Sequence, residues 1–275
     1  MSHVLSRDNT VIAYDRVGEG PSLVIVEGAL VAGRTNHTAG QLAEALASRF
    51  TVYTYDRRGR GDSGDTGPYS VALELDDLDA VISEGGGEAF VFGVSAGAVL
   101  ALDAAARGSA IKKLAVYGAP FIVDDSRPPV PNDYLARLNE RLAANRRGDA
   151  VELFFAEAIG MPAERIAGMR SQPFWVGLER VAHTLAYDGA ILGDTTSGRP
   201  LPSARWSRIT VPTLVIDGGA SDTFIHTAAE ALANNLAQAR RLTLPDQTQD
   251  YAADTMAPAL VEFFSETSTT ESYAA

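Results

Sequence analysis

The feature of this chain that most restricts its fold is an alternation of short apolar runs with amphipathic helical patterns. Continuous apolar runs indicate strands that are buried on both faces. Strands that alternate with helices indicate a mostly parallel sheet with helices on both faces. The runs that we expect to form strands are 11–17, 23–26, 51–56, 89–94, 113–117, 211–217 and 239–245.

Residues 124–208 interrupt this alternation, because they carry only helical patterns, such as that of 134–159. A chain of 275 residues suits one α/β core with an insertion. We therefore expect a core made of residues 1–123 and 209–265, with 124–208 as a helical cap. The polar, low-complexity residues 266–275 are expected to form a flexible tail.

Composition excludes several classes of function. The chain has no cysteine, which rules out disulfides, cysteine-ligated zinc and a thiol nucleophile. Its formal charge of −12 argues against nucleic acid or an anionic membrane as a partner. The first residues lack an apolar signal core, and no run is long enough to span a bilayer. We expect a cytoplasmic protein that binds a small molecule; the sequence does not indicate its oligomeric state.

Residues 93–97 read G-V-S-A-G, with a strand pattern before them and a helical pattern after them. This setting is typical of a nucleophile elbow, a sharp turn that lifts the serine hydroxyl above the carboxyl edge of a sheet. Glycines flank Ser95 because strand and helix backbones pack too closely for a Cβ. The Ala96 N–H begins the helix and is expected to be one oxyanion donor.

The run Val26-Glu27-Gly28-Ala29-Leu30 follows a predicted strand and contains the candidate for a second oxyanion donor, the Ala29 N–H. An ordinary strand-to-loop glycine is an equally good explanation of Gly28. Residues 55–63 read Y-D-R-R-G-R-G-D-S, and we interpret this mixed-charge segment as a salt-bridged structural loop.

Four segments follow one another along the chain: EGAL, YDRRGRGDSG, GVSAG and TLVIDGGASD. In these segments and their order the chain resembles α/β-hydrolases of the actinobacterial type, relatives of lipases, esterases and perhydrolases. The resemblance runs from about Ser2 to Phe264. It implies an α/β-hydrolase fold with an eight-stranded sheet and a cap, and no cofactor. It also implies that Ser95 is the nucleophile, that Ala29 and Ala96 are the oxyanion donors and that Asp222 is the acid.

The resemblance fails at the triad base. Relatives commonly read G-Q-T-H-D after the last strand, with that histidine as base, whereas this chain has Gln249 there. A neutral amide cannot accept the proton of Ser95, so ordinary Ser-His-Asp hydrolysis is not expected. Two further departures are Val94, where relatives read histidine, and Gly118, where relatives read glutamate in Y-E-P-P.

Four other residues are candidates for the pocket or for a substitute base. His183 and Tyr187 share one face of a helical pattern in the cap, which can look down on Ser95. His183 can equally be a packing residue. His37 lies near the predicted oxyanion loop, and Trp175 can line an apolar pocket or pack in the cap core.

Three functions remain open on the sequence alone. The first is a cofactor-free enzyme that performs a cyclase- or lyase-type step on a small apolar carbonyl compound in natural-product biosynthesis. The second is an ester, lactone or thioester hydrolase with a displaced base. The third is a non-catalytic protein that binds a small ligand, since the fold alone does not decide function.

Overall fold

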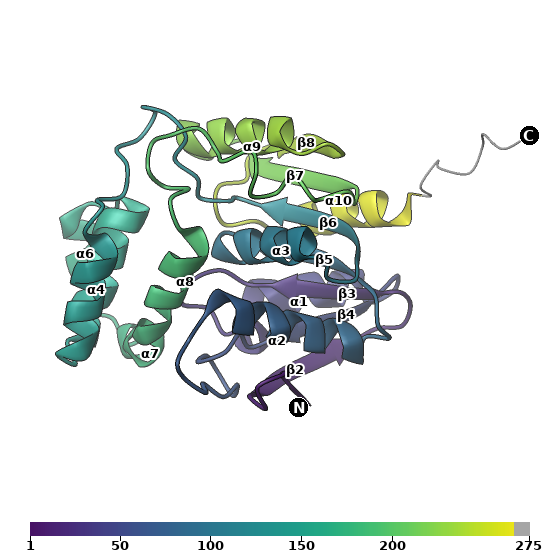
Figure 1. Ribbon diagram of the computed structural model, residues 1–275, viewed down its shortest axis with the longest axis horizontal. Helices are drawn as coiled ribbons and strands as arrows, with labels where there is room; N and C mark the ends of the chain where they lie inside the picture. The colour runs from purple at the N-terminus through teal and green to yellow at the C-terminus, as the bar shows by residue number, and fades with distance from the viewer. Residues whose placement is uncertain (267–275) are drawn as a thin grey trace, which may run out of the picture.

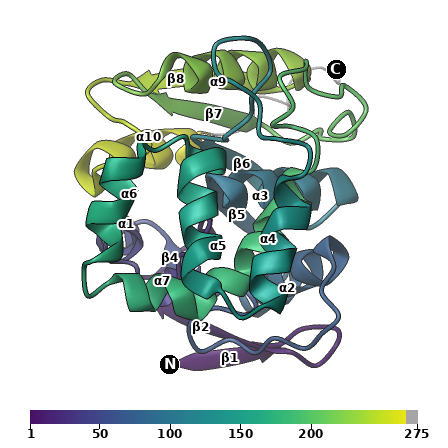
Figure 2. The same ribbon diagram turned by 90° about the vertical axis from the view of Figure 1, so that its left-hand side faces the viewer.

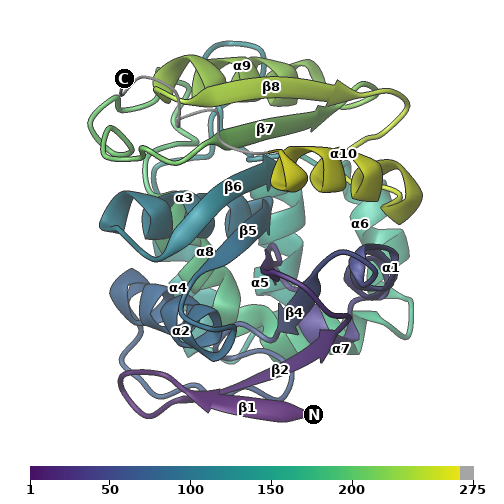
Figure 3. The same cartoon turned by 90° about the vertical axis from the view of Figure 1, so that its right-hand side faces the viewer.

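The computed structural model describes residues 1–266, and its centre is an eight-stranded sheet with strand order β1-β2-β4-β3-β5-β6-β7-β8. Figure 1 shows the sheet in the middle of the molecule, and Figure 3 shows it from β1 at one edge to β8 at the other. The strands are β1 (Ser2–Leu5), β2 (Val11–Val17), β3 (Ser22–Val26), β4 (Thr51–Tyr55), β5 (Ala89–Val94), β6 (Ile111–Tyr117), β7 (Thr213–Gly218) and β8 (Ala239–Leu244).

The sheet is mostly parallel, as the sequence predicts. The parallel pairs are β4–β3, β3–β5, β5–β6, β6–β7 and β7–β8, and only β1–β2 and β2–β4 are antiparallel. The expected eight-stranded α/β fold is confirmed. Strand β1 was not predicted, because its four residues are mostly exposed and carry no buried apolar run.

Helices cover both faces of the sheet. One face packs against α1 (His37–Leu46) and α10 (Ala253–Ser265) through residues such as Leu42, Met256 and Leu260. The other face packs against helices that contribute Leu78, Val99 and Ala228, among others; these are α2 (Val71–Glu84), α3 (Ala96–Arg107) and α9 (Thr223–Asn235). Because both faces are covered, most residues of the central strands β3 and β7 are buried, which explains their continuous apolar runs.

The described chain from β6 to β7 contains helices and no strand. The helices gather at one end of the sheet, where Figure 1 shows them from the side and Figure 2 from the front. They are α4 (Tyr134–Ala143), α5 (Arg147–Leu153), the π-helical turn Phe154–Ile159, α6 (Ala163–Arg170), α7 (Trp175–Val181), the short turn Ala182–Thr184 and α8 (Leu185–Leu192).

These helices lie within the segment 124–208 that the sequence assigns to a cap, and we call them the cap. They have a hydrophobic cluster of their own, with Leu138, Val151 and Trp175 buried in it. The predicted tail 266–275 lies, except for its first residue, outside the described residues.

Candidate active site

Ser95 occupies a strained turn between β5 and α3. Its backbone has φ 54° and ψ −122°, an uncommon conformation for a residue with a side chain. The flanking glycines are required by close packing: a Cβ on Gly97 would lie 2.2 Å from the Val26 carbonyl oxygen, and one on Gly93 would lie 2.7 Å from the Gly97 oxygen. Such strain is stored where a side chain must be held in a functional position.

The loop after β3 lies directly beside this turn. A Cβ on Gly28 would lie 3.0 Å from the Cβ of Ser95, so the loop backbone borders the serine. Within residues 1–266 neither the Ala29 N–H nor the Ala96 N–H donates a hydrogen bond to the protein. Leu30 has φ 61°, a second strained position in the same loop. Two unused donors beside a serine hydroxyl are the arrangement that an oxyanion site requires.

Two connected cavities open at Ser95. The first, the cap cavity, has a volume of about 270 Å³ and extends under the cap past Ala96, Tyr134 and Leu192. The second, the loop cavity, has a volume of about 340 Å³ and extends over the sheet edge; the residues common to both are Ala29, Ser95, Phe154, Ile159 and Gln249. Ser95 is therefore accessible to a small molecule from either cavity.

Gln249 lies where the resemblance places the base. It belongs to the loop between β8 and α10, and it lines both cavities together with Ser95. The neighbouring Thr248 carbonyl accepts a hydrogen bond from the Tyr117 hydroxyl, which ties this loop to the end of β6. Ser95, Ala29, Ala96 and Gln249 therefore lie around one space.

Asp222 does not join them. Its side chain is exposed at the start of α9, makes no hydrogen bond that caps the helix and lines neither cavity. The charge of Asp222 acts instead on Arg127, whose guanidinium lies over the Phe224 ring and lines the cap cavity. The strand TLVID does lead to Asp222, but the following turn carries its carboxylate away from Ser95.

The proposed substitute bases and pocket residues also lie elsewhere. His183 and Tyr187 do contact each other, at 5.9 Å between ring centroids, but both bind Asp65 of the loop after β4. Burial lowers the pKa of His183 below its usual value. His37 begins α1 beside a separate surface hollow, and Trp175 packs in the cap core. Within residues 1–266 no histidine lines either cavity at Ser95.

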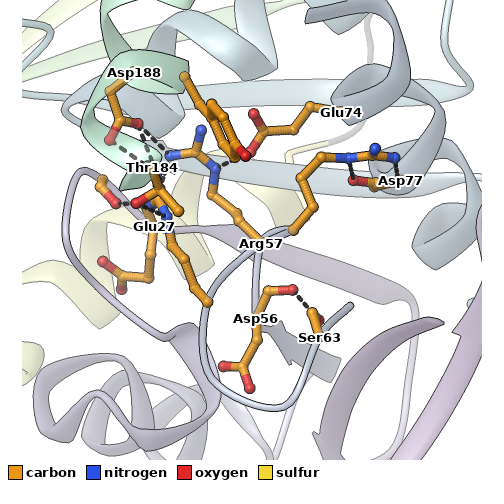
Figure 4. A network of polar contacts seen from close by, with 12 residues as sticks. Glu27, Asp56, Arg57, Ser63, Glu74, Asp77, Thr184 and Asp188 are labelled. Carbon is orange, nitrogen blue, oxygen red and sulfur yellow. Dashed lines mark hydrogen bonds and ion pairs between the residues drawn. The ribbon is translucent and has the colours of Figure 1, made fainter. Parts of the chain in front are cut away.

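The arginine-rich loop after β4 is a buried ion-pair network, as the sequence predicts (Figure 4). Arg57 pairs with Glu74 at 2.6 Å and with Asp188 of α8 at 2.9 Å, and Arg60 binds both carboxylate oxygens of Asp188 at 2.8 Å. The same two guanidiniums hold the oxyanion loop, since they donate to the carbonyls of Glu27 at 3.2 Å and Gly28 at 2.5 Å. The arginine-rich loop therefore holds the oxyanion loop in position as well as stabilising the fold.

Glu27 is the site residue that sequence reasoning missed. It lines the loop cavity with Ser95, Gln249 and Tyr251, and only 6% of its surface is exposed. Burial raises the pKa of Glu27 to about 7, although the Gly28 backbone, Arg60 and Arg57 act to lower it. The available signal was an acidic residue directly after the buried apolar run Leu23–Val26, at the carboxyl end of a central strand.

The described residues contain no cluster of three or more acidic, histidine or cysteine side chains suited to a metal ion. Nor does any described helix have the length and apolar character needed to cross a membrane.

Comparisons with known proteins identify the family of the chain. The model of the alpha/beta hydrolase family matches residues 29–259. The chain belongs to that family. An alpha/beta hydrolase of known structure from Sphaerobacter thermophilus is 53% identical, with a TM-score of 0.87 over 96% of this chain and 100% of the other.

Two further similarities are weaker. An uncharacterized hydrolase of Bacillus subtilis, YraK, is 35% identical over 96 residues, which span 34% of this chain and 34% of that protein. The enol-lactonase of Burkholderia xenovorans has a TM-score of 0.68 at 21% identity, over 96% of this chain and 100% of the other. At that identity the likeness concerns the fold alone. Neither match adds to the assignment of this protein to the alpha/beta hydrolase family.

Proposed function

We propose that this protein is a cofactor-free enzyme that binds a small, largely apolar carbonyl compound beside Ser95. The Ala29 and Ala96 N–H groups polarise the carbonyl, and the reaction is a non-hydrolytic step of the cyclase or lyase type, of the kind used in natural-product biosynthesis. Side chains such as Val130, Leu135 and Phe154 give the cap cavity its apolar character, which suits such a substrate.

The observation that carries the proposal is the combination of two unused oxyanion donors with a serine whose two cavities are lined by no histidine of the described residues. Donors preorganised at a carbonyl oxygen stabilise the negative charge of an enolate as well as that of a tetrahedral intermediate. Acyl transfer, in contrast, requires a base that takes the proton of the serine hydroxyl. Gln249 is an amide and cannot perform that step.

Hydrolysis of an ester or lactone is the second candidate. It is favoured by the intact serine turn, and by Glu27, a carboxylate in the same cavity that is able to accept a proton. The 53% identical protein from Sphaerobacter thermophilus is also described as a hydrolase.

Turnover of 4-nitrophenyl butyrate by the native protein and by Gln249→His separates the two candidates. We expect weak native activity and a gain in the variant of about 10²-fold, at the lower end of what a general base contributes, because Asp222 lines neither cavity and is not placed to orient the new imidazole. Gln249→Asn is the matched control and should show no gain. Vigorous native hydrolysis that Gln249→His leaves unchanged would refute the non-hydrolytic proposal.

A further inference from the structure

Glu27 differs from every other buried carboxylate in the described chain. Five of the six are ion-paired: Asp56 with Arg34, Glu74 and Asp188 with Arg57, Asp77 with Arg58, and Asp217 with Arg241. Glu27 has no ion pair within residues 1–266. A buried carboxylate without an ion-pair partner is costly to fold, so its presence requires another explanation.

The nearby arginines do not neutralise the carboxylate directly. Arg57 and Arg60 bind the main-chain carbonyls of Glu27 and Gly28, and their remaining contacts go to Glu74, Asp188 and Thr184. Figure 4 shows the Glu27 side chain pointing away from the Arg57 guanidinium. The network thus holds the backbone of the loop and leaves the carboxylate available.

The strand geometry explains where this carboxylate points. Residues two apart on a strand lie on the same face, and Ile25 packs with Tyr117 and Tyr251 on the side of α1 and α10. Glu27 continues that row just beyond the last residue of β3. It therefore enters the loop cavity on the side of the terminal loop, while Gly28 borders Ser95.

The titratable and charged groups that face Glu27 come from three elements. They are Arg57 and Arg60 from the loop after β4, Tyr117 from β6, and Asp250 and Tyr251 from the loop after β8. Burial is the largest influence on Glu27, and its pKa of about 7 leaves roughly half of the carboxyl groups ionised at neutral pH. A base with a pKa near the working pH is the most effective in proton transfer.

We propose that Glu27 is the catalytic base of this site and takes a proton from the carbon next to the substrate carbonyl. The C–H electron pair becomes the C=C bond of an enolate, whose oxygen is held by the Ala29 and Ala96 N–H groups. The enolate then attacks an electrophilic carbon of the same molecule or expels a leaving group. The protonated Glu27 returns its proton to the oxygen that gains the negative charge. This inference rests on the proposed function, which supplies the two donors.

The probe that we choose for the base is 5-nitrobenzisoxazole. A base removes its ring C–H proton, the ring N–O bond breaks, and the coloured 2-cyano-4-nitrophenolate is released without any acyl transfer. The native protein should release it faster than acetate does at equal concentration and pH. The rate should rise with pH and reach its midpoint near pH 7, where Glu27 ionises.

Glu27→Gln removes the base at nearly constant shape and should lower this rate about 10²-fold or more. Glu27→Asp keeps a carboxylate on a shorter arm and should recover part of the rate. Glu44→Gln, an exposed position on α1 away from the site, is the matched control and should match the native rate. Thermal unfolding of each variant verifies that it is folded.

A native rate no higher than that of acetate overturns the proposal. So does a rate that Glu27→Gln leaves unchanged, or one without a midpoint near pH 7. If Glu27→Gln does not fold, the native pH profile and Glu27→Asp decide. Failure of the proposed function gives a different result: vigorous ester hydrolysis would refute the non-hydrolytic step, while the loss of 5-nitrobenzisoxazole turnover in Glu27→Gln would still identify the base.

Discussion

Asp188 of the cap accepts two hydrogen bonds of 2.8 Å from Arg60 of the sheet loop, and Arg60 in turn holds the Gly28 carbonyl beside Ser95. Arg57 makes a parallel link, since it pairs with Asp188 and donates to the Glu27 carbonyl, so two buried ion pairs join the cap to the oxyanion loop. All three side chains are almost completely buried, so the pairs are protected from water and from screening by salt.

Loss of the Asp188 charge should destabilise the whole protein. In Asp188→Asn, the buried guanidiniums of Arg57 and Arg60 lose their shared counter-charge, and we expect the free energy of unfolding to fall by about 3 kcal/mol. Glu88→Gln, which removes the exposed pair with Lys112, is the control and should cost less than about 1 kcal/mol. Urea unfolding of both variants measures the two effects. Equal, small effects would show that the Asp188 bridge is not important for stability.

The serine turn should tolerate no side chain at Gly97. A Cβ there would lie 2.2 Å from the Val26 oxygen and 2.5 Å from the Glu27 oxygen, so Gly97→Ala must displace the turn or the end of β3. We expect a loss of about 3 kcal/mol or more in urea unfolding. The matched control is Gly168→Ala in α6, where an added Cβ meets nothing within 4 Å; it should gain about 0.5 kcal/mol. A Gly97→Ala protein of native stability would contradict the packing described here.

The raised pKa of Glu27 predicts how the stability of the protein changes with pH. The pKa of Glu27 in the folded protein, about 7, lies above the value of 4.5 expected in the unfolded chain, so the folded state binds more protons between these values. The contribution of Glu27 to the free energy of unfolding is therefore fully present below about pH 4.5 and is lost as the pH rises through 7. The loss amounts to about 3 kcal/mol at most.

Glu27→Gln should remove this component. The difference in unfolding free energy between the native protein and the variant, measured from pH 5 to pH 8, should shift in favour of the variant as the pH rises. A difference that does not change with pH would show that Glu27 ionises normally.

Sequence reasoning succeeded where the pattern is local. The G-x-S-x-G turn of Ser95 lies between a strand and a helix, and its two glycines are required by contacts with neighbouring backbone. The buried runs of the parallel strands were equally clear, because both faces of the sheet are covered. The exposed strand β1 gave no such signal.

Reasoning from position along the chain failed where a side chain's direction depends on tertiary packing. Asp222 follows the expected strand, yet its turn leaves it exposed. His183 contacts Tyr187 as expected, but it lies in the short turn before α8 and binds Asp65. The ion pairs of Arg57, Arg58 and Arg60 could be predicted, because the loop carries charges of both signs and buried guanidiniums must be paired. The sequence places Glu27 at the carboxyl end of a central strand, but only the packed structure shows that this buried carboxylate has no ion-pair partner within residues 1–266.

The central claim is that Ser95 is not an activated nucleophile, and intact-mass spectrometry after incubation with a 4-nitrophenyl alkylphosphonate tests it most directly. An activated serine forms an Oγ–P bond and expels 4-nitrophenolate, and the protein gains the mass of the phosphonyl group. We expect the native protein to remain unlabelled over the time in which Gln249→His becomes labelled at Ser95. Rapid labelling of native Ser95 that Glu27→Gln abolishes would contradict the account and identify the protein as a serine hydrolase with Glu27 as its base.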